Sequence, residues 1–259
     1  SAVSRGLGDV YKRQRCNSKK KKTFLIWCEK TKIINIMSRK RKAPKRKSYP
    51  DPKYQSEVIS KFINSIMSVS KLFENTRIPV LAAPLFIISY PELVIAQCKA
   101  GVIGSFPALN ARPAEELEKW IIQISSELDK YKKENPNEVV APFAVNQICH
   151  SSNDRLEHDV EVCVKHKVPM VITSLRAPKF VVDAIHSYGG VVMHDVINVR
   201  HAKKAVDEGA DGLILVCAGA GGHAGTLSPF ALVNEVREFF DGPIAPFCYS
   251  HLRAHETLH

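Results

Sequence analysis

The sequence predicts an α/β fold of the (β/α)8 TIM-barrel type, and two patterns in it support this prediction. Short apolar runs recur from residue 78 onward, and a helical segment follows each of the first six. Strict alternation of strand and helix is typical of a parallel sheet with right-handed crossovers. The 259-residue chain offers six such units and the start of a seventh. We therefore expect a barrel truncated after about six βα units, preceded by a disordered basic tail.

The expected strands are apolar runs that hardly alternate with polar residues, as in strands buried on both faces. They cover residues 78–84, 101–108, 139–146, 168–174, 190–196, 212–217 and 243–247. The expected helices lie between them, at residues 91–100, 113–134, 156–167, 179–188, 199–208 and 230–240.

Residue types at the helix ends support these bounds. Ser89 and Glu92 have the spacing of a capping box, in which each side chain binds a free backbone N–H of the first turn. Ser228 before Pro229 fits an N-cap with proline at the first helical position. Pro136 is expected to stop the long helix before the third strand.

The net charge of +11 is unevenly distributed. Residues 1–47 hold 17 of the 37 Lys and Arg residues and 2 of the 26 Asp and Glu residues, which leaves 20 basic and 24 acidic residues for the rest. A basic tail can neutralise phosphates, but the acidic remainder argues against nucleic-acid binding by the body of the protein.

We expect four segments along the chain. Residues 1–36 contain Asp9–Gln14, which resembles a translated sequencing adaptor, and are excluded from fold reasoning. Residues 37–67 form a basic arm and a short amphipathic helix, residues 68–247 form the partial barrel, and residues 248–259 form an aberrant C-terminal tail.

The basic arm resembles the amino terminus of the seventh small-subunit ribosomal protein. The resemblance lies in Ser38–Ala43, Pro50–Tyr54 and Lys61–Asn64. It implies an rRNA-contacting arm from a different gene, and hence a chimera joined near Ser68.

The cysteines indicate the compartment. All seven lack metal-like pair spacing, and we expect free, buried thiols in a cytoplasmic protein. The apolar run at residues 24–28 is too short to span a bilayer.

The most informative stretch for function is the glycine-rich loop after the sixth strand. Gly219, Gly221, Gly222 and Gly225 allow a ligand to approach the backbone, and His223 is the titratable side chain among them. The loop follows a strand's carboxyl end, where β/α barrels keep their chemistry. A histidine that merely satisfies a turn is the alternative reading.

Other strand ends should converge on the same edge of the barrel. They supply Ala83, Pro84, Phe106, Pro107, Asn146, Gln147, Ser174, His194 and Asp195. Asn146 is either a core amide bonded to a neighbouring strand or a contact to a ligand. No metal-ligand spacing is present in the sequence, and we expect no metal site.

A dinucleotide-binding reading of the glycine loop is weaker. Gly219, Gly221 and Ala224 match its G-x-G-x-x-A pattern after a strand. No helix opens within the loop, and no acidic residue follows at the expected distance.

The same residues resemble the nitronate monooxygenase family of FMN-dependent β/α barrels, over about residues 72–244. The resemblance is carried by Ile78–Pro84, Ala100–Pro107, Asn146, Val199–Ala202 and Gly221–Gly225. It implies oxidation of nitronates or nitroalkanes with O2. It also implies FMN contacts from Ala83, Pro84, Leu85, Asn146, Gly221 and Gly222, and His223 as the catalytic base.

Three positions depart from the family pattern: Leu85, Val216 and Asp195 replace a Met, a Gln and a Lys that other members have. Phosphate-binding loops of barrels commonly follow strands seven and eight, so we expect the chain as printed to bind FMN poorly. Two alternatives stay open. One is a flavin-dependent enoyl-thioester reductase, and the other is RNA binding through the basic arm.

Overall fold

A computed structural model describes residues 72–176, 179–221 and 225–247. The strands in these residues are β1 (Gly104–Pro107), β2 (Phe143–Ile148), β3 (Met170–Ser174), β4 (Val191–Val196), β5 (Gly212–Val216) and β6 (Ile244–Phe247). The helices are α4 (Pro91–Lys99), α5 (Glu116–Glu134), α6 (Leu156–Lys165), α7 (Lys179–His186), α8 (Val199–Asp207) and α9 (Pro229–Arg237), with a 3-10 helix η1 at Ala108–Asn110. The basic arm and the C-terminal tail lie outside the described residues.

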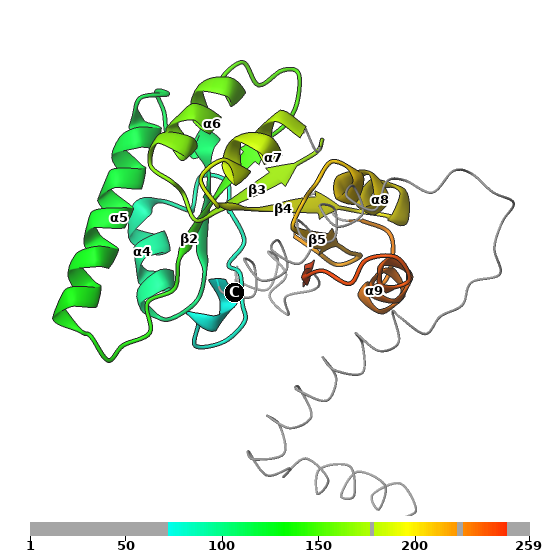
Figure 1. Cartoon of the computed structure of the whole chain (residues 1–259), viewed down its shortest axis with the longest axis horizontal. Helices are drawn as coiled ribbons and strands as arrows, with labels where there is room; N and C mark the ends of the chain where they lie inside the picture. The colour runs from blue at the N-terminus through cyan, green and yellow to red at the C-terminus, as the bar shows by residue number, and fades with distance from the viewer. Residues whose placement is uncertain (1–71, 177–178, 222–224, 248–259) are drawn as a thin grey trace, which may run out of the picture. The chain divides into compact units, whose positions relative to one another are not determined.

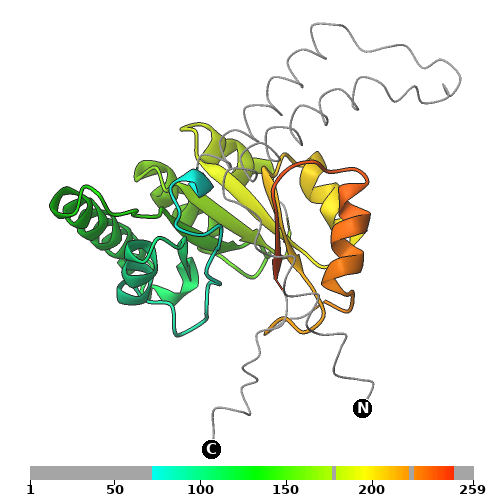
Figure 2. The same cartoon turned by 90° about the horizontal axis from the view of Figure 1, so that it is seen from below.

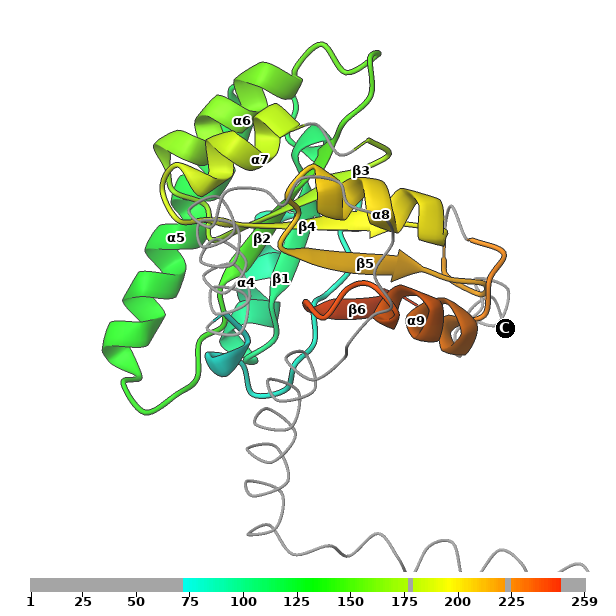
Figure 3. The same cartoon turned by 45° about the vertical axis from the view of Figure 1, so that its right-hand side comes forward.

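The strands form one parallel sheet in the order β1-β2-β3-β4-β5-β6, with an α-helix in every connection. Figures 1 and 3 show the strands side by side with the helices beside them, and Figure 2 shows α5 (green) and α9 (orange) at opposite ends of the sheet. This order confirms the barrel-type prediction. A dinucleotide-binding sheet would instead reverse its strand order at a switch point.

The sheet curls, because residues from its two ends share one cluster on the inner face. Ile103, just before β1, belongs to the same apolar cluster as Met170 and Met193, and Ala245 of β6 packs against that cluster. The described residues therefore form a six-stranded half-barrel with its own inner core.

The outer face of the sheet is covered by amphipathic helices. On α5 the buried residues are Leu117, Ile121, Ile124 and Leu128, at the three- and four-residue spacing of one helical face. They join the outer cluster that includes Phe106 of β1. A second outer cluster packs α8 and α9 against β5.

The first expected strand, at residues 78–84, is reduced to an isolated parallel bridge between Leu81 and Ile103. The backbone of Ile103 donates to the carbonyl of Val80 and accepts from the amide of Ala82. Pro79 and Pro84 have no N–H to extend the ladder on either side. The segment lies where predicted, but it is not a full strand.

Three helix starts differ in detail from the sequence prediction. At α4 the N-cap is Tyr90, which makes no side-chain cap, and Ser89 Oγ accepts from the amide of Leu85 at 2.9 Å. The predicted capping box is therefore wrong. Ser228 is the N-cap of α9, as expected, but its side chain makes no capping bond. Asn198, which was not predicted, caps α8 by accepting from the amide of His201 at 2.9 Å.

Candidate functional site

The two faces of each strand contact two different apolar cores. On β2, Val145 belongs to the outer core and Ala144 to the inner core. Because side chains alternate along a strand, Asn146 faces inward with Ala144 and Gln147 faces outward. Gln147 Nε2 lies 3.5 Å from Sγ of Cys163 on α6, which agrees with this direction. The inner face near the strands' carboxyl ends is the candidate site.

Three polar side chains form a chain across the inner face of β2, β3 and β4. Asn146 Nδ2 lies 2.7 Å from Ser174 Oγ and 3.3 Å from the carbonyl oxygen of Ile172. Ser174 Oγ in turn donates to Asp195 Oδ2 at 2.6 Å. Parallel strands bring these side chains together at the edge where barrel enzymes carry their chemistry.

Burial changes the protonation of Asp195. Loss of hydration raises the pKa of its carboxyl group to about 6, against the opposing effect of the hydrogen bond from Ser174. A carboxyl group in this range exchanges its proton close to neutral pH, and such groups cluster at functional sites.

Ala83 and Pro84 are half-buried and follow the bridge at Leu81. Ser105 Oγ of β1 donates to the carbonyl oxygen of Ala82, directly before them. The Ala83-Pro84 segment is thus attached to the inner face beside β1, next to the strand that carries Asn146.

Leu85 begins an apolar loop that a buried asparagine holds in place. Asn110 Nδ2 donates to the carbonyl oxygens of Leu85, at 3.0 Å, and Ser89, at 3.1 Å, and Asn110 Oδ1 accepts from the amide of Ile87 at 3.2 Å. Leu85 itself is 43% exposed. Asn110 orders this exposed apolar segment through three bonds to its backbone.

A backbone hydrogen bond joins the two ends of the glycine loop after β5. The amide of Ala218 donates to the carbonyl of Leu227 at 2.8 Å, and Gly219 has a φ of 88°. Gly225 lies so close to β5 that a Cβ on it would overlap the carbonyl oxygen of Val216. Gly221 is exposed, and a Cβ on it would meet nothing within 4 Å. Gly222 and His223 lie outside the described residues.

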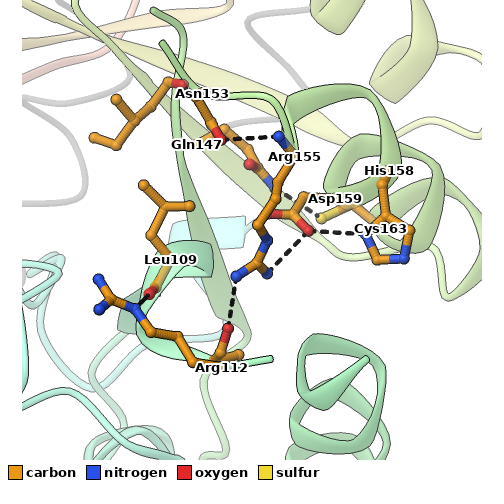
Figure 4. A network of polar contacts seen from close by, with 10 residues as sticks. Leu109, Arg112, Gln147, Asn153, Arg155, His158, Asp159 and Cys163 are labelled. Atoms are coloured by element: carbon orange, nitrogen blue, oxygen red, sulfur yellow. Dashed lines mark hydrogen bonds and ion pairs between the residues drawn. The ribbon is translucent and has the colours of Figure 1, made fainter. Parts of the chain in front are cut away.

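A second polar network lies on the outer side of β2 (Figure 4). Arg155 donates to the carbonyl of Ala111 at 2.8 Å and to Asp159 Oδ1 at 3.1 Å. Asp159 is fully buried, and His158 Nδ1 lies 3.0 Å from the same oxygen. Because Asp159 is part of α6 and Gln147 faces that helix, this network does not belong to the inner site.

The described residues contain no group of three or more His, Cys, Asp or Glu side chains arranged to hold a metal ion. Within the same residues, none of the helices combines the length and apolarity that a membrane span requires. Cys98, Cys149 and Cys163 are free and buried, as the sequence predicts, and Cys217 is buried as well.

Sequence reasoning listed Ser174 and Asp195 among the strand ends but gave them no role, and it did not find Asn110. The signal for the first two was available in the alternation of side chains. Asn146, Ser174 and Asp195 all take the inward-facing position near the end of their strand. The sequence gives no such signal for Asn110, because the backbone atoms that it binds belong to a loop whose conformation the sequence pattern does not predict.

Comparison with known proteins identifies a family that matches most of the described residues. The family model described as nitronate monooxygenase matches residues 68–246. A curated relative is (3aS,4S,5R,7aS)-5-hydroxy-7a-methyl-1-oxo-octahydro-1H-indene-4-carboxyl-CoA dehydrogenase from Rhodococcus jostii, 25% identical over 166 residues. That match covers 64% of this chain and 43% of the relative, so the chain spans less than half of the relative's length.

Two solved structures share the fold. FabK from Thermotoga maritima is 26% identical, with a TM-score of 0.59 over 69% of this chain and 52% of FabK. Nitroalkane oxidase from Streptomyces ansochromogenes is 19% identical, with a TM-score of 0.59 over 69% of this chain and 60% of that structure. At this lower identity the likeness shows the fold alone.

A different protein matches a short segment. Small ribosomal subunit protein uS7 from Halorhodospira halophila is 60% identical over 35 residues, which is 14% of this chain and 23% of the ribosomal protein. This match confirms the ribosomal-protein resemblance. The family match begins at residue 68, directly after the segment in which that resemblance was found.

Proposed function

Because the chain belongs to the nitronate monooxygenase family, we propose that it acts as a flavin-dependent oxidoreductase with FMN as its cofactor. The proposed reaction is the oxidation of alkyl nitronates or nitroalkanes by O2 to carbonyl compounds and nitrite. The family match over residues 68–246 is the observation that carries this proposal. The polar chain on the inner face near the strands' carboxyl ends supports it.

The described residues fit a flat ring with polar edges. Asn146 is buried on the inner face, and its amide oxygen makes no hydrogen bond within the described part of the chain. Gly221 leaves space for a ligand beside the backbone. We propose that Ala83, Pro84, Leu85, Asn146, Gly221 and Gly222 hold the FMN.

When bound, the flavin takes electrons from the substrate and passes them to oxygen. We propose His223 as the base that removes the proton from the carbon beside the nitro group, because imidazole exchanges protons near neutral pH. His223 lies outside the described residues. Its neighbours in the described part, Gly221 and Gly225, flank it in the loop after β5.

The variant His223→Asn tests this role. We expect turnover of neutral nitroalkanes to fall by about 10²- to 10⁴-fold, the usual contribution of a general base. Turnover of preformed nitronates should be largely retained, since they have already lost the proton. His150→Gln, which changes an exposed histidine, is the matched control. Unchanged kinetics of His223→Asn on both substrates would refute the assignment.

A second candidate is a flavin-dependent reductase acting on an enoyl thioester. It is favoured by the 25% identity to a dehydrogenase whose name specifies a carboxyl-CoA substrate, a thioester of the same class. Oxidation of NAD(P)H that depends on an enoyl thioester, with nitronate inert, would establish this function in place of the first.

We propose that the basic arm at residues 37–67 is a ribosomal-protein segment joined to the enzyme, and that the enzyme domain at 68–247 is cytoplasmic. The uS7 match supports the first part, and the free, buried thiols support the second. RNA affinity that falls with salt and disappears when residues 1–67 are deleted would instead give the arm a function of its own.

A further inference from the structure

Asn146, Ser174 and Asp195 are linked in a row by hydrogen bonds. The carboxylate of Asp195 determines which group donates in each of them. An ionised carboxylate only accepts, so the Ser174 hydroxyl uses its single hydrogen on Asp195 Oδ2, at 2.6 Å. Toward Asn146 the Ser174 oxygen then accepts, 2.7 Å from Nδ2. The Ile172 carbonyl oxygen, 3.3 Å from Nδ2, also only accepts. Both neighbours therefore require the amide nitrogen of Asn146 on their side.

The amide oxygen of Asn146 is consequently turned away from both neighbours. No other described residue bonds to it, although the side chain is only 4% exposed. An amide oxygen with an unused lone pair on the inner face can accept from a ligand that brings a hydrogen-bond donor. The oxidised flavin ring carries one N–H, at N3, whereas N1, N5 and the two carbonyl oxygens accept hydrogen bonds.

We propose that Ser174 and Asp195 are positioning residues that hold Asn146 as a hydrogen-bond acceptor for the N3–H of a flavin ring. This inference rests on the proposed flavin-dependent function. It gives specific roles to two inner-face side chains that the proposed proton abstraction leaves unused. It also makes the ring edge, and not the phosphate, the part of the cofactor that these residues recognise.

The test compares FMN with 3-methyl-FMN, in which a methyl group replaces the N3–H. Their affinities for the full chain are measured by quenching of flavin fluorescence. We expect the wild type to prefer FMN by about tenfold or more, because the methyl group leaves the Asn146 oxygen without its donor. In Ser174→Ala and Asp195→Asn the preference should fall to about threefold or less, because the amide of Asn146 is no longer held in one orientation.

Thr173→Val is the matched control. Thr173 Oγ1 lies 2.7 Å from His194 Nδ1 on the opposite face of the same two strands. This variant therefore loses one buried hydrogen bond of similar length next to Ser174 and should keep the preference for FMN. Equal affinity of the wild type for both flavins, or a preference that survives both inner-face variants, overturns the inference.

A second measurement needs no flavin and separates the inference from the proposed function. In ¹⁵N-labelled protein, the side-chain amide protons of Asn146, assigned with Asn146→Asp, should exchange slowly with solvent. Exchange should become at least about tenfold faster in Ser174→Ala, where one of the two acceptors is lost, and stay unchanged in Thr173→Val. If the wild type binds neither flavin, the proposed function fails. Unchanged exchange in Ser174→Ala overturns the positioning role by itself.

Discussion

His194 and Asp195 are neighbours on β4, yet they face opposite sides of the sheet. Burial lowers the pKa of His194 to about 4 and raises the pKa of Asp195 to about 6. In both cases loss of hydration favours the neutral form of the side chain. As the pH falls from about 6 to 4, His194 therefore destabilises the fold, whereas Asp195 stabilises it, because the folded protein takes up the proton of Asp195 before the unfolded chain does.

His194 should make the fold sensitive to acid. Its pKa is near 6.5 in the unfolded chain and about 4 in the folded protein, so the unfolded chain binds the extra proton first as the pH falls. The contribution of His194 to stability should thus decrease between pH 6.5 and 4, by up to about 3 kcal/mol, while Asp195 contributes in the opposite direction. Urea titrations of the wild type and His194→Gln across this range measure the effect.

The stability of His194→Gln relative to the wild type should rise as the pH falls from 6.5 to 4, because the variant lacks the ionisable group. His150→Gln, at an exposed position, serves as the control. An acid slope in His194→Gln that equals that of the wild type would show that other groups cause the decrease.

At the scale of an element, the loop after β5 depends on one close approach. A Cβ at residue 225 would overlap the carbonyl oxygen of Val216. Gly225→Ala should therefore displace the loop or the end of β5 and lower the free energy of unfolding by about 1–3 kcal/mol. Thermal unfolding measures this change.

Gly221→Ala is the control within the same loop, because its added methyl group meets no atom within 4 Å. Its melting temperature should stay close to that of the wild type. If both alanine variants are equally stable, the contact between Gly225 and Val216 does not restrict the loop.

The attachment of α6 to the loop after η1 depends on a buried ion pair. Arg155 contacts both Asp159 and the carbonyl of Ala111, and Asp159 is fully buried. Arg155→Met leaves the carboxylate without its cation, so we expect a loss of about 3–5 kcal/mol in unfolding free energy. Chemical denaturation gives the value.

The double variant Arg155→Met/Asp159→Leu should recover much of that stability, since it leaves no unpaired charge in the interior. A double variant less stable than Arg155→Met would show that Asp159 is stabilised without Arg155. His158, 3.0 Å from Asp159, is the side chain that could then provide the compensating contact.

Across the whole molecule, the strand order and the helix positions could be read from the sequence, because buried parallel strands are continuous apolar runs. Contacts set by loop geometry could not. Ser89 binds the backbone of Leu85 in place of capping α4. Asn110 holds an apolar loop that is distant from it in sequence.

The candidate site, like the fold, could be predicted only in part from the sequence. The position of Asn146 follows from its place near a strand end, but its orientation depends on Ser174 and Asp195 on two other strands. Only the register of the folded sheet brings these three side chains into contact. The sequence therefore predicts that Asn146 faces the inner side of the sheet, but it does not predict which atom of the amide group points away from the neighbouring strands.

The consecutive order β1 to β6 also bears on how the chain folds. Every strand pairs with the strand one helix away in sequence, so each pairing waits only for the next βα unit of the chain. Each βα unit can join the growing sheet as soon as it leaves the ribosome, without waiting for a distant segment.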